Sequence, residues 1–211
     1  MIRVMLVDDH AVVRTGFRLL LETAIDVRVV AEADSGEAAC AGFDEASPDV
    51  VVLDLSMPGI GGLETLKRLR ARDRDARLLA LSAHDDSMHA RRALQQGALG
   101  FLTKRTAPET LLEAVRAVAA GRRYIDPRLA QQLALADVDG NASAVERLSG
   151  REFEVFIRLA KGEDVQRIAD ALSLSASTVG THLYNVKQKL GATNQAELTL
   201  LALRAGLIEA E

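Results

Sequence analysis

Short apolar runs typical of β-strands alternate with amphipathic helical patterns over residues 1–124. The apolar runs are IRVMLV, VRVVAEA, DVVVLDL, RLLALS and GALGFL, and segments such as AVVRTGFRLLLET and PETLLEAVRAVAAG lie between them. Helical crossovers make successive strands parallel and place helices on both faces of the sheet. The alternation therefore predicts a doubly wound α/β domain with a five-stranded parallel sheet and flavodoxin-like topology.

The rest of the chain has a different pattern. Residues 125–147 begin as a short helix and pass into a polar stretch without periodicity, which predicts a linker. Residues 148–211 show four helical patterns and no strand signal, so they predict a small all-α domain. Capping boxes support the helix starts in both domains, with Asp34 and Glu37 in the first and Ser149 and Glu152 in the second.

Composition restricts the classes of function. No apolar run approaches the roughly 20 residues that span a bilayer, and the start MIRVMLVDDH does not resemble a signal peptide, so we expect a cytoplasmic protein without a membrane partner. A single cysteine excludes internal disulfides and cysteine-based zinc clusters. The net charge of -4 provides no overall attraction to nucleic acid, so any DNA binding must be local.

Polar side chains follow the predicted strands of the first domain. Asp8 and Asp9 follow the first strand, Asp54 ends the third, Ser82 ends the fourth and Lys104 follows the fifth. Ligands of open parallel sheets bind outside the carboxyl ends of the strands, so these groups should converge. Carboxylates this close repel one another, and an all-oxygen set favours Mg²⁺ as the compensating cation. The lysine completes a site for an anionic group.

That anionic group could be a phosphoryl group carried by an aspartate. Asp54 is the natural nucleophile, because the adjacent Asp8 and Asp9 are better placed to hold the metal. The alternative for an acidic pair after a strand is a turn or a helix cap. A flavodoxin would need a phosphate-binding loop where this chain has DDHAVV, and an aspartyl phosphatase would need a carboxylate in place of Ser56, so we do not expect an enzyme.

The motifs LVDDH, VVLDLSMPGIGG, ALSAH and GALGFLTK resemble the receiver domain of bacterial two-component response regulators over the whole first domain. The resemblance implies that a sensor histidine kinase phosphorylates Asp54. It also implies Mg²⁺ bound directly by Asp9, through water by Asp8, and by the backbone carbonyl of Ser56. Ser82 and Lys104 would contact the phosphoryl oxygens, with Phe101 as an aromatic switch.

The stretch LSLSASTVGTHLYNVKQKL in the second domain predicts a helix with two distinct faces. Val179, Leu183, Val186 and Leu190 form one apolar stripe, which must face a core. The opposite face and the helix start carry the candidate DNA contacts, which are Ser177, Thr178, Gly180, Thr181, Tyr184, Lys187 and Lys189. The preceding segment DVQRIADALSLS adds a short helix and a tight turn, which predicts a helix-turn-helix; an ordinary helical hairpin is the alternative.

LSGREFEVFIRLAKGEDVQRIADALSLSASTVGTHLYNVKQKLG resembles a LuxR-type DNA-binding domain. The whole chain then resembles a NarL/FixJ-type response regulator, and YIDPRLAQQLALA resembles the GacA/UvrY branch. The resemblance implies binding to double-stranded promoter DNA and a homodimer on phosphorylation; packing within one domain is the alternative role of the last helix. Gly180 and Tyr184 depart from the usual pattern, which leaves open a phosphorylation-controlled protein-interaction adaptor that does not read DNA.

Overall fold

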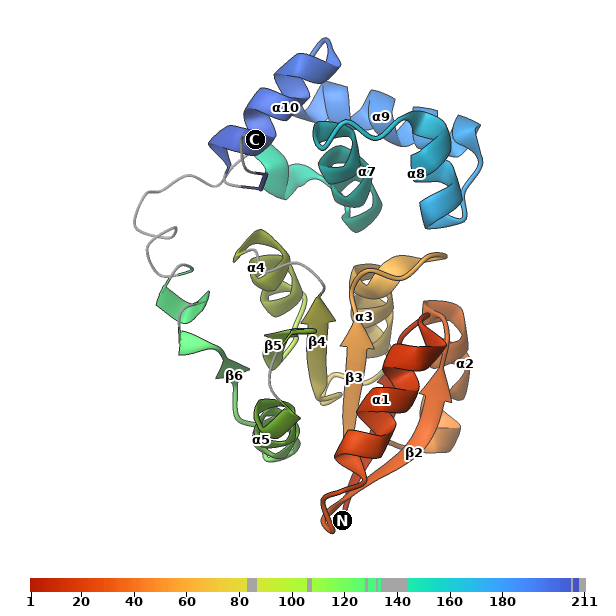
Figure 1. The fold of residues 1–211 in the computed structure, drawn as a ribbon, viewed down its shortest axis with the longest axis vertical. Coiled ribbons are helices and arrows are strands. Elements are labelled where there is room, and N and C mark those ends of the chain that lie inside the picture. Colours follow the sequence, from red (N-terminus) through yellow and green to blue (C-terminus); the bar gives the residue numbers. More distant parts are fainter. Residues whose placement is uncertain are drawn as a thin grey trace. The chain divides into compact units, whose positions relative to one another are not determined.

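The computed structural model describes the chain apart from residues 83–86, 106–107, 128, 132, 134–143, 206 and 209–211. The chain forms two compact units, Met1–Leu135 and Ala136–Glu211 (Figure 1). The first unit runs past the predicted domain end at Tyr124, and much of the predicted linker, 134–143, lies outside the described residues. None of the helices in the described ranges is long and apolar enough to cross a membrane.

A parallel sheet with the strand order β2-β1-β3-β4-β5-β6 forms the centre of the first unit. Its strands are β1 (Ile2–Val7), β2 (Val27–Ala33), β3 (Val50–Asp54), β4 (Leu78–Ser82), β5 (Gly100–Thr103) and β6 (Tyr124–Ile125). The parallel α/β prediction is confirmed, whereas the prediction of five strands is wrong. The sixth strand has only two residues, which are too few to show the alternation from which a strand is predicted.

Helices cover both faces of the sheet (Figure 1). They are α1 (Ala11–Leu21) and α5 (Pro108–Ala119) on one face, and α2 (Gly36–Ala46), α3 (Gly61–Arg72) and α4 (Ser87–Gln95) on the other. In β3, Val51 and Leu53 pack on the side of α2, α3 and α4, while Val50 and Val52 pack on the opposite side. Burial on both faces explains why the strand is a continuous apolar run.

The start of α2 differs from the prediction. Ser35 rather than Asp34 caps the helix, because the Ser35 hydroxyl accepts a hydrogen bond from the Ala38 amide at 3.3 Å. Asp34 accepts a hydrogen bond from that hydroxyl instead. The Glu37 carboxylate reaches a distant loop and accepts a hydrogen bond from the Ile60 amide at 3.0 Å. The predicted capping box of Asp34 and Glu37 is therefore wrong.

The second unit is helical. It contains η1 (Ala144–Arg147), α7 (Gly150–Ala160), α8 (Val165–Leu172), α9 (Ala176–Leu190) and α10 (Gln195–Arg204). The predicted capping box of Ser149 and Glu152 is present at the start of α7. Ser173 ends α8 in the left-handed conformation with φ of 52°, and the Ser175 side chain caps α9. This tight turn between α8 and α9 confirms the predicted helix-turn-helix.

The start of α3 lies against the backbone at the end of β3. A Cβ atom at Gly62 would lie 2.2 Å from the Asp54 carbonyl oxygen and 2.4 Å from the Leu55 Cα. Because backbone atoms cannot rotate away, we expect Gly62→Ala to lower the free energy of unfolding by about 3 kcal/mol, the upper end for overpacking. Urea unfolding of the full chain, followed by circular dichroism, measures this loss.

Gly16 in α1 provides a matched control, because a Cβ atom there would have no neighbour within 4 Å among the residues that the structure describes. Gly16→Ala should raise the free energy of unfolding by up to about 1 kcal/mol through helix propensity alone. A Gly62→Ala variant as stable as the wild type would contradict the close approach of α3 to β3.

Candidate functional site

Three carboxylates lie together at the carboxyl edge of the sheet. Asp8 and Asp9 follow β1 and Asp54 ends β3, and the two strands are parallel neighbours with Val7 opposite Leu53. One ligand atom from each of Asp8, Asp9, His10 and Asp54 lies within 4.8 Å of the others. The Asp54 residue is fully buried and Asp8 is 3% exposed. The predicted convergence of strand ends therefore holds for these aspartates.

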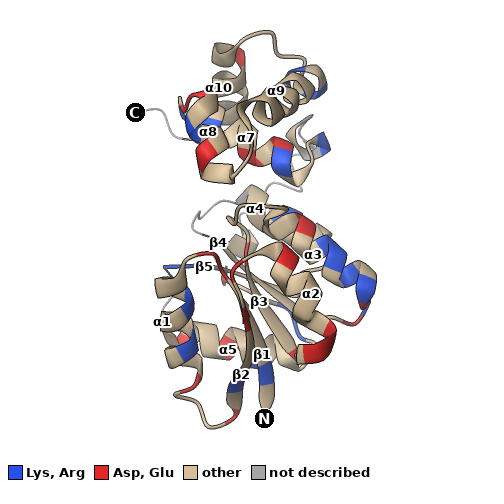
Figure 2. Ribbon diagram, turned by 90° about the vertical axis from the view of Figure 1, so that its right-hand side faces the viewer, with Lys and Arg blue, Asp and Glu red and all other residues tan. Residues whose placement is uncertain are grey.

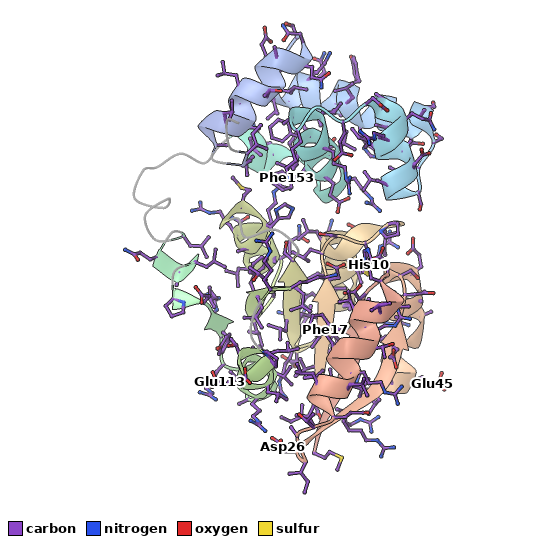
Figure 3. The ribbon with its side chains drawn as sticks, in the orientation of Figure 1. His10, Phe17, Asp26, Glu45, Glu113 and Phe153 are labelled. Atoms are coloured by element: carbon purple, nitrogen blue, oxygen red, sulfur yellow. The ribbon has the colours of Figure 1, made fainter. Side chains whose placement is uncertain are left out.

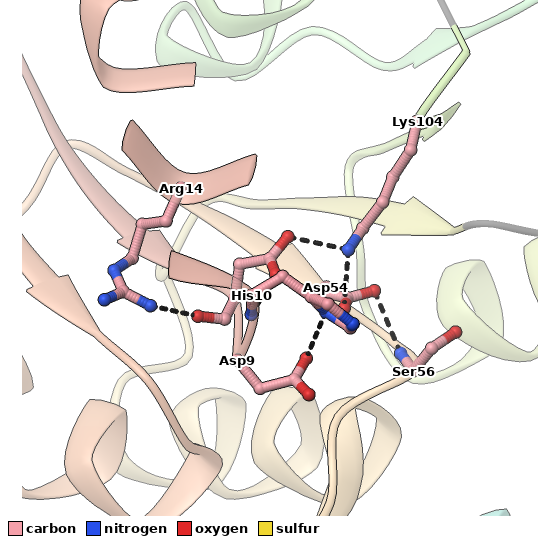
Figure 4. A network of polar contacts seen from close by, with 7 residues as sticks. Asp9, His10, Arg14, Asp54, Ser56 and Lys104 are labelled. Carbon is pink, nitrogen blue, oxygen red and sulfur yellow. Dashed lines mark hydrogen bonds and ion pairs between the residues drawn. The ribbon is translucent and has the colours of Figure 1, made fainter. Parts of the chain in front are cut away.

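Lys104 connects two of these carboxylates (Figure 4). Its Nζ lies 2.7 Å from Asp8 Oδ2 and 2.8 Å from Asp54 Oδ2. The Lys104 amide donates a hydrogen bond to the Ser82 carbonyl at 2.7 Å, which holds the segment after β5 against the end of β4. The side chain is thereby directed across the strand ends into the acidic cluster.

The charges of this cluster are not balanced. Burial raises the pKa of the Asp54 carboxyl, and the Lys104 ammonium opposes this effect only in part. Burial lowers the pKa of Lys104, but the Asp54 and Asp8 carboxylates raise it by more, so that the ammonium remains charged at neutral pH. One ammonium thus faces an excess of carboxylates, and the site favours an additional cation.

The Asp54 side chain is also held by the loop that follows it. Asp54 Oδ1 accepts a hydrogen bond from the Ser56 amide at 3.0 Å. Gly59 and Gly61 have φ values of 73° and 74°, in the left-handed region that favours glycine, and form the bend before α3. Asp54 is therefore fixed on one side by Lys104 and on the other by this loop.

The two remaining predicted residues of the first unit are buried in the neighbouring strands β4 and β5. Ser82 is fully buried at the end of β4. It directly follows Leu81, which pairs with Asp54. Phe101 in β5 is also fully buried and belongs to the core on the side of α2, α3 and α4. Its ring is therefore directed inward in this structure.

The second candidate surface is one face of α9. Ser177, Gly180, Thr181 and Tyr184 are exposed, with Tyr184 64% exposed, while Val179 and Val186 are buried on the opposite face. A Cβ atom at Gly180 would have no atom of the described part of the chain within 4 Å. The predicted division of the helix into an apolar core face and a polar exposed face is present.

The predicted basic contacts on this helix already have partners within the unit. Lys187 Nζ donates a hydrogen bond to the Thr193 carbonyl at 3.1 Å, and Lys189 Nζ lies 2.6 Å from Glu152 Oε2. Both lysines belong to the last turn of α9, and the Lys residues of this helix are coloured blue in Figure 2. Thr178 is half-buried, and its hydroxyl lies 2.8 Å from that of Ser175. Ser177, Thr181, Tyr184 and Lys189 are the exposed side chains among the predicted contacts.

Two family matches cover the two units. Residues 4–116 match the response regulator receiver domain, and residues 146–202 match the bacterial regulatory proteins of the luxR family. The chain belongs to the LuxR-type response regulators. These matches confirm the resemblance that the two sets of motifs predicted.

Relatives match this response regulator over its whole length. Response regulator GacA of Pseudomonas viridiflava is 41% identical over 212 residues, which cover 100% of this chain and 99% of that protein. Response regulator UvrY of Escherichia coli K12 is 39% identical over 213 residues, which cover 100% and 98%. RcsB from Salmonella enterica serovar Typhimurium, bound to promoter rprA with the phosphomimetic BeF3⁻, is 27% identical, with a TM-score of 0.64 over 95% of this chain and 97% of that one.

Two neighbours of the acidic cluster in this response regulator were missed by the sequence prediction. His10 Nδ1 lies 3.0 Å from Asp9 Oδ1, and Arg14 Nη1 donates a hydrogen bond to the Asp8 carbonyl at 2.6 Å. His10 could have been found from its position directly after Asp9. Arg14 had a weaker signal, because only the helical spacing from His10 places it beside the site.

The last helix packs within its own unit. Leu198 and Ala202 in α10 are fully buried, so packing within the unit accounts for these two residues. Leu200 is 46% exposed and Leu201 is half-buried. A role of α10 between two copies of the chain stays a prediction.

The ion pair of Glu152 and Lys189 should make the second unit sensitive to acid. Burial raises the pKa of Glu152, but hydrogen bonds from Lys189 and Ser149 lower it below the usual 4.5. A depressed pKa stabilises the fold above the unfolded-state pKa, and this contribution is lost as pH falls through the folded-state value. We therefore expect Glu152→Gln to be less stable than the wild type at neutral pH and to lose less stability in acid, as measured by urea unfolding against pH.

Lys189→Met is the complementary variant. It leaves the buried Glu152 carboxylate without its ammonium partner, so it should destabilise the unit more than the double variant that also carries Glu152→Gln. Equal pH dependence of unfolding in the wild type and Glu152→Gln would contradict this assignment.

Proposed function

We propose that this response regulator accepts a phosphoryl group on Asp54 from a sensor histidine kinase and that the phosphorylated form binds double-stranded promoter DNA. The observation that carries the proposal is the buried Asp54 carboxylate, which lies 2.8 Å from Lys104 within a cluster of further carboxylates. A carboxylate oxygen of Asp54 would form the new bond to phosphorus as the bond from phosphorus to the kinase histidine nitrogen breaks. Lys104 would neutralise charge on the equatorial phosphoryl oxygens.

The donor set of the site fits Mg²⁺. Asp8, Asp9, Asp54 and the Ser56 carbonyl would supply oxygen ligands, the type that this cation prefers. Asp9 Oδ1 is buried and lies 3.0 Å from His10 Nδ1, and Asp9 belongs to the cluster of ligand atoms that could hold the ion. A bound Mg²⁺ would supply positive charge to the transferring phosphoryl group.

Ser82 and Phe101 would transmit the change at Asp54. In this proposal the Ser82 hydroxyl moves toward the new phosphoryl oxygens and Phe101 packs inward. The inward ring of the present structure is the arrangement that the proposal assigns to the phosphorylated state. The size of such a population shift is limited by how differently the phosphoryl group interacts with the two states.

Asp54→Asn should abolish phosphorylation, because the amide is not a nucleophile toward phosphorus. The purified full chain and this variant are treated with Mg²⁺ and a small-molecule phosphodonor, and intact mass is measured. Each sample is then used to select genomic DNA fragments. We expect only the wild type to gain a labile phosphoryl group and to enrich a shared inverted repeat; retention of labile phosphate by Asp54→Asn would contradict the assignment.

The exposed face of α9 would read the DNA. The free backbone amides at the start of a helix favour binding of phosphate. Ser177 and Thr178 would therefore contact the phosphate backbone of the DNA. Thr181 and Tyr184 would contact bases, and the absent side chain at Gly180 would let the helix backbone approach closely. Lys187 and Lys189 would bind DNA phosphates. Such contacts position the protein on the DNA more than they read its sequence. A phosphorylated homodimer would read two half-sites about 10 bp apart.

Gly180→Lys should change the preferred DNA sequence. A lysine at this position can contact guanine, and such a contact is worth about 1 to 3 kcal/mol of discrimination between bases. Fragment selection with the phosphorylated variant would show the altered repeat. Ala196→Lys adds the same charge at an exposed position of α10, outside α9, and should keep the wild-type sequence preference. An unchanged preferred site in Gly180→Lys would exclude a role for Gly180 in base reading.

A phosphorylation-controlled protein-interaction adaptor is the second candidate. It is favoured by the internal partners of Lys187 and Lys189, which reduce the cationic charge that α9 offers to DNA. The second domain also has seven basic and eight acidic residues over 148–211, so its net charge does not attract DNA. Failure of both phosphorylated and unphosphorylated protein to enrich any fragment would favour the adaptor.

A further inference from the structure

The Glu37 carboxylate forms a contact that the proposed phosphorylation mechanism does not use. Glu37 lies in the first turn of α2, and its Oε1 accepts a hydrogen bond from the Ile60 amide at 3.0 Å. Ile60 belongs to the loop that joins Asp54 to α3. The contact therefore links a helix outside the acidic cluster to the loop that carries Ser56.

The backbone on both sides is shaped to allow this contact. A Cβ atom at Gly36 would lie 1.9 Å from Thr65 Oγ1 and 2.7 Å from Ile60 Cγ1, so only glycine lets the start of α2 come this close. Gly59 has a φ of 73°, and a Cβ atom there would lie 2.7 Å from both Glu37 carboxylate oxygens. The carboxylate is thus seated directly against the Gly59-Ile60 backbone.

The same loop is attached to the site at its other end. The Ser56 amide donates to Asp54 Oδ1 at 3.0 Å, and the Gly62 amide donates to the Leu55 carbonyl at 3.3 Å. Glu37 supplies a third attachment at the end of the loop next to α3, from a different helix. Without it, the segment between Ser56 and Ile60 loses its hydrogen bond to α2.

We propose that Glu37 is a positioning residue for the phosphoacceptor loop. By fixing Ile60, it holds the backbone of Ser56 in the orientation in which the amide binds Asp54 and the carbonyl is available to Mg²⁺. This inference rests on the proposed function, because it concerns the same site. Glu37 acts through the loop and contacts neither the metal nor the phosphoryl group.

Mg²⁺ affinity of the full-length chain tests the proposal without requiring phosphorylation. Mg²⁺ alone is titrated into the wild type and variants, and binding is followed by the NMR signals of the Ser56 and Asp54 amides. We expect Glu37→Ala to bind Mg²⁺ about tenfold more weakly, the low end for partners that orient metal ligands. Glu37→Gln retains an oxygen that can accept from Ile60 and should bind nearly as tightly as the wild type.

Glu45→Ala is the matched control, since Glu45 is an exposed glutamate near the other end of α2 (Figure 3). It should leave Mg²⁺ affinity unchanged. Hydrogen exchange provides a second readout. The Ile60 amide should exchange faster in Glu37→Ala than in the wild type, while amides of β1 and β3 keep their protection, which separates loss of the loop contact from general unfolding.

The outcomes separate the inference from the function on which it rests. If the wild type binds Mg²⁺ and accepts a phosphoryl group, and Glu37→Ala does both equally well, the positioning role is wrong and the proposed function stands. Loss of affinity in Glu37→Gln as large as in Glu37→Ala also overturns the hydrogen-bond account. If the wild type binds no Mg²⁺ and accepts no phosphoryl group, the proposed function fails and this inference fails with it.

Discussion

The acidic cluster at the ends of β1 and β3 is the constraint on which the receiver depends. Asp8 and Asp54 are buried and share the ammonium of Lys104, while Asp9 lies beside them. Two carboxylates and one ammonium leave a net negative charge in a buried place. Burial raises the pKa of the Asp54 carboxyl, and the Asp8 carboxylate adds to this effect. A fold that keeps these groups together must gain stability elsewhere, and the buried apolar strands provide it.

The alternation of strands and helices made most of this site predictable. Once parallel strands are recognised, their carboxyl ends must meet at one edge, and Asp8, Asp54 and Lys104 follow from their positions in the chain. β6 could not be predicted in the same way, because Tyr124 and Ile125 are too few for a periodic signal. The contact of Glu37 with Ile60 could not be predicted for another reason. A glutamate three residues after Asp34 is compatible with a capping box and equally with a contact to a residue 23 positions away.

The second unit shows a different limit of sequence prediction. The apolar stripe containing Val179 and Val186 fixed which face of α9 is buried, and this requires only local periodicity. The partners of the lysines depend on tertiary contacts. Lys189 pairs with Glu152, 37 residues away, so a side chain that looked like a phosphate contact also fixes α9 against α7. Counting charges along the helix cannot distinguish these two roles, because both require a basic residue in the last turn.

Gly180 has no explanation within its own unit. Gly62 is required because a Cβ atom would meet the backbone of Asp54 and Leu55. A Cβ atom at Gly180 would meet no atom of the described residues within 4 Å, and Gly180 lies inside a regular helix. Glycine in such a position lowers stability by about 1 kcal/mol relative to alanine. In the described ranges, neither close packing nor a turn explains the glycine. If α9 reads DNA as proposed, the exposed face around Thr181 and Tyr184 is where the DNA would approach the bare helix backbone.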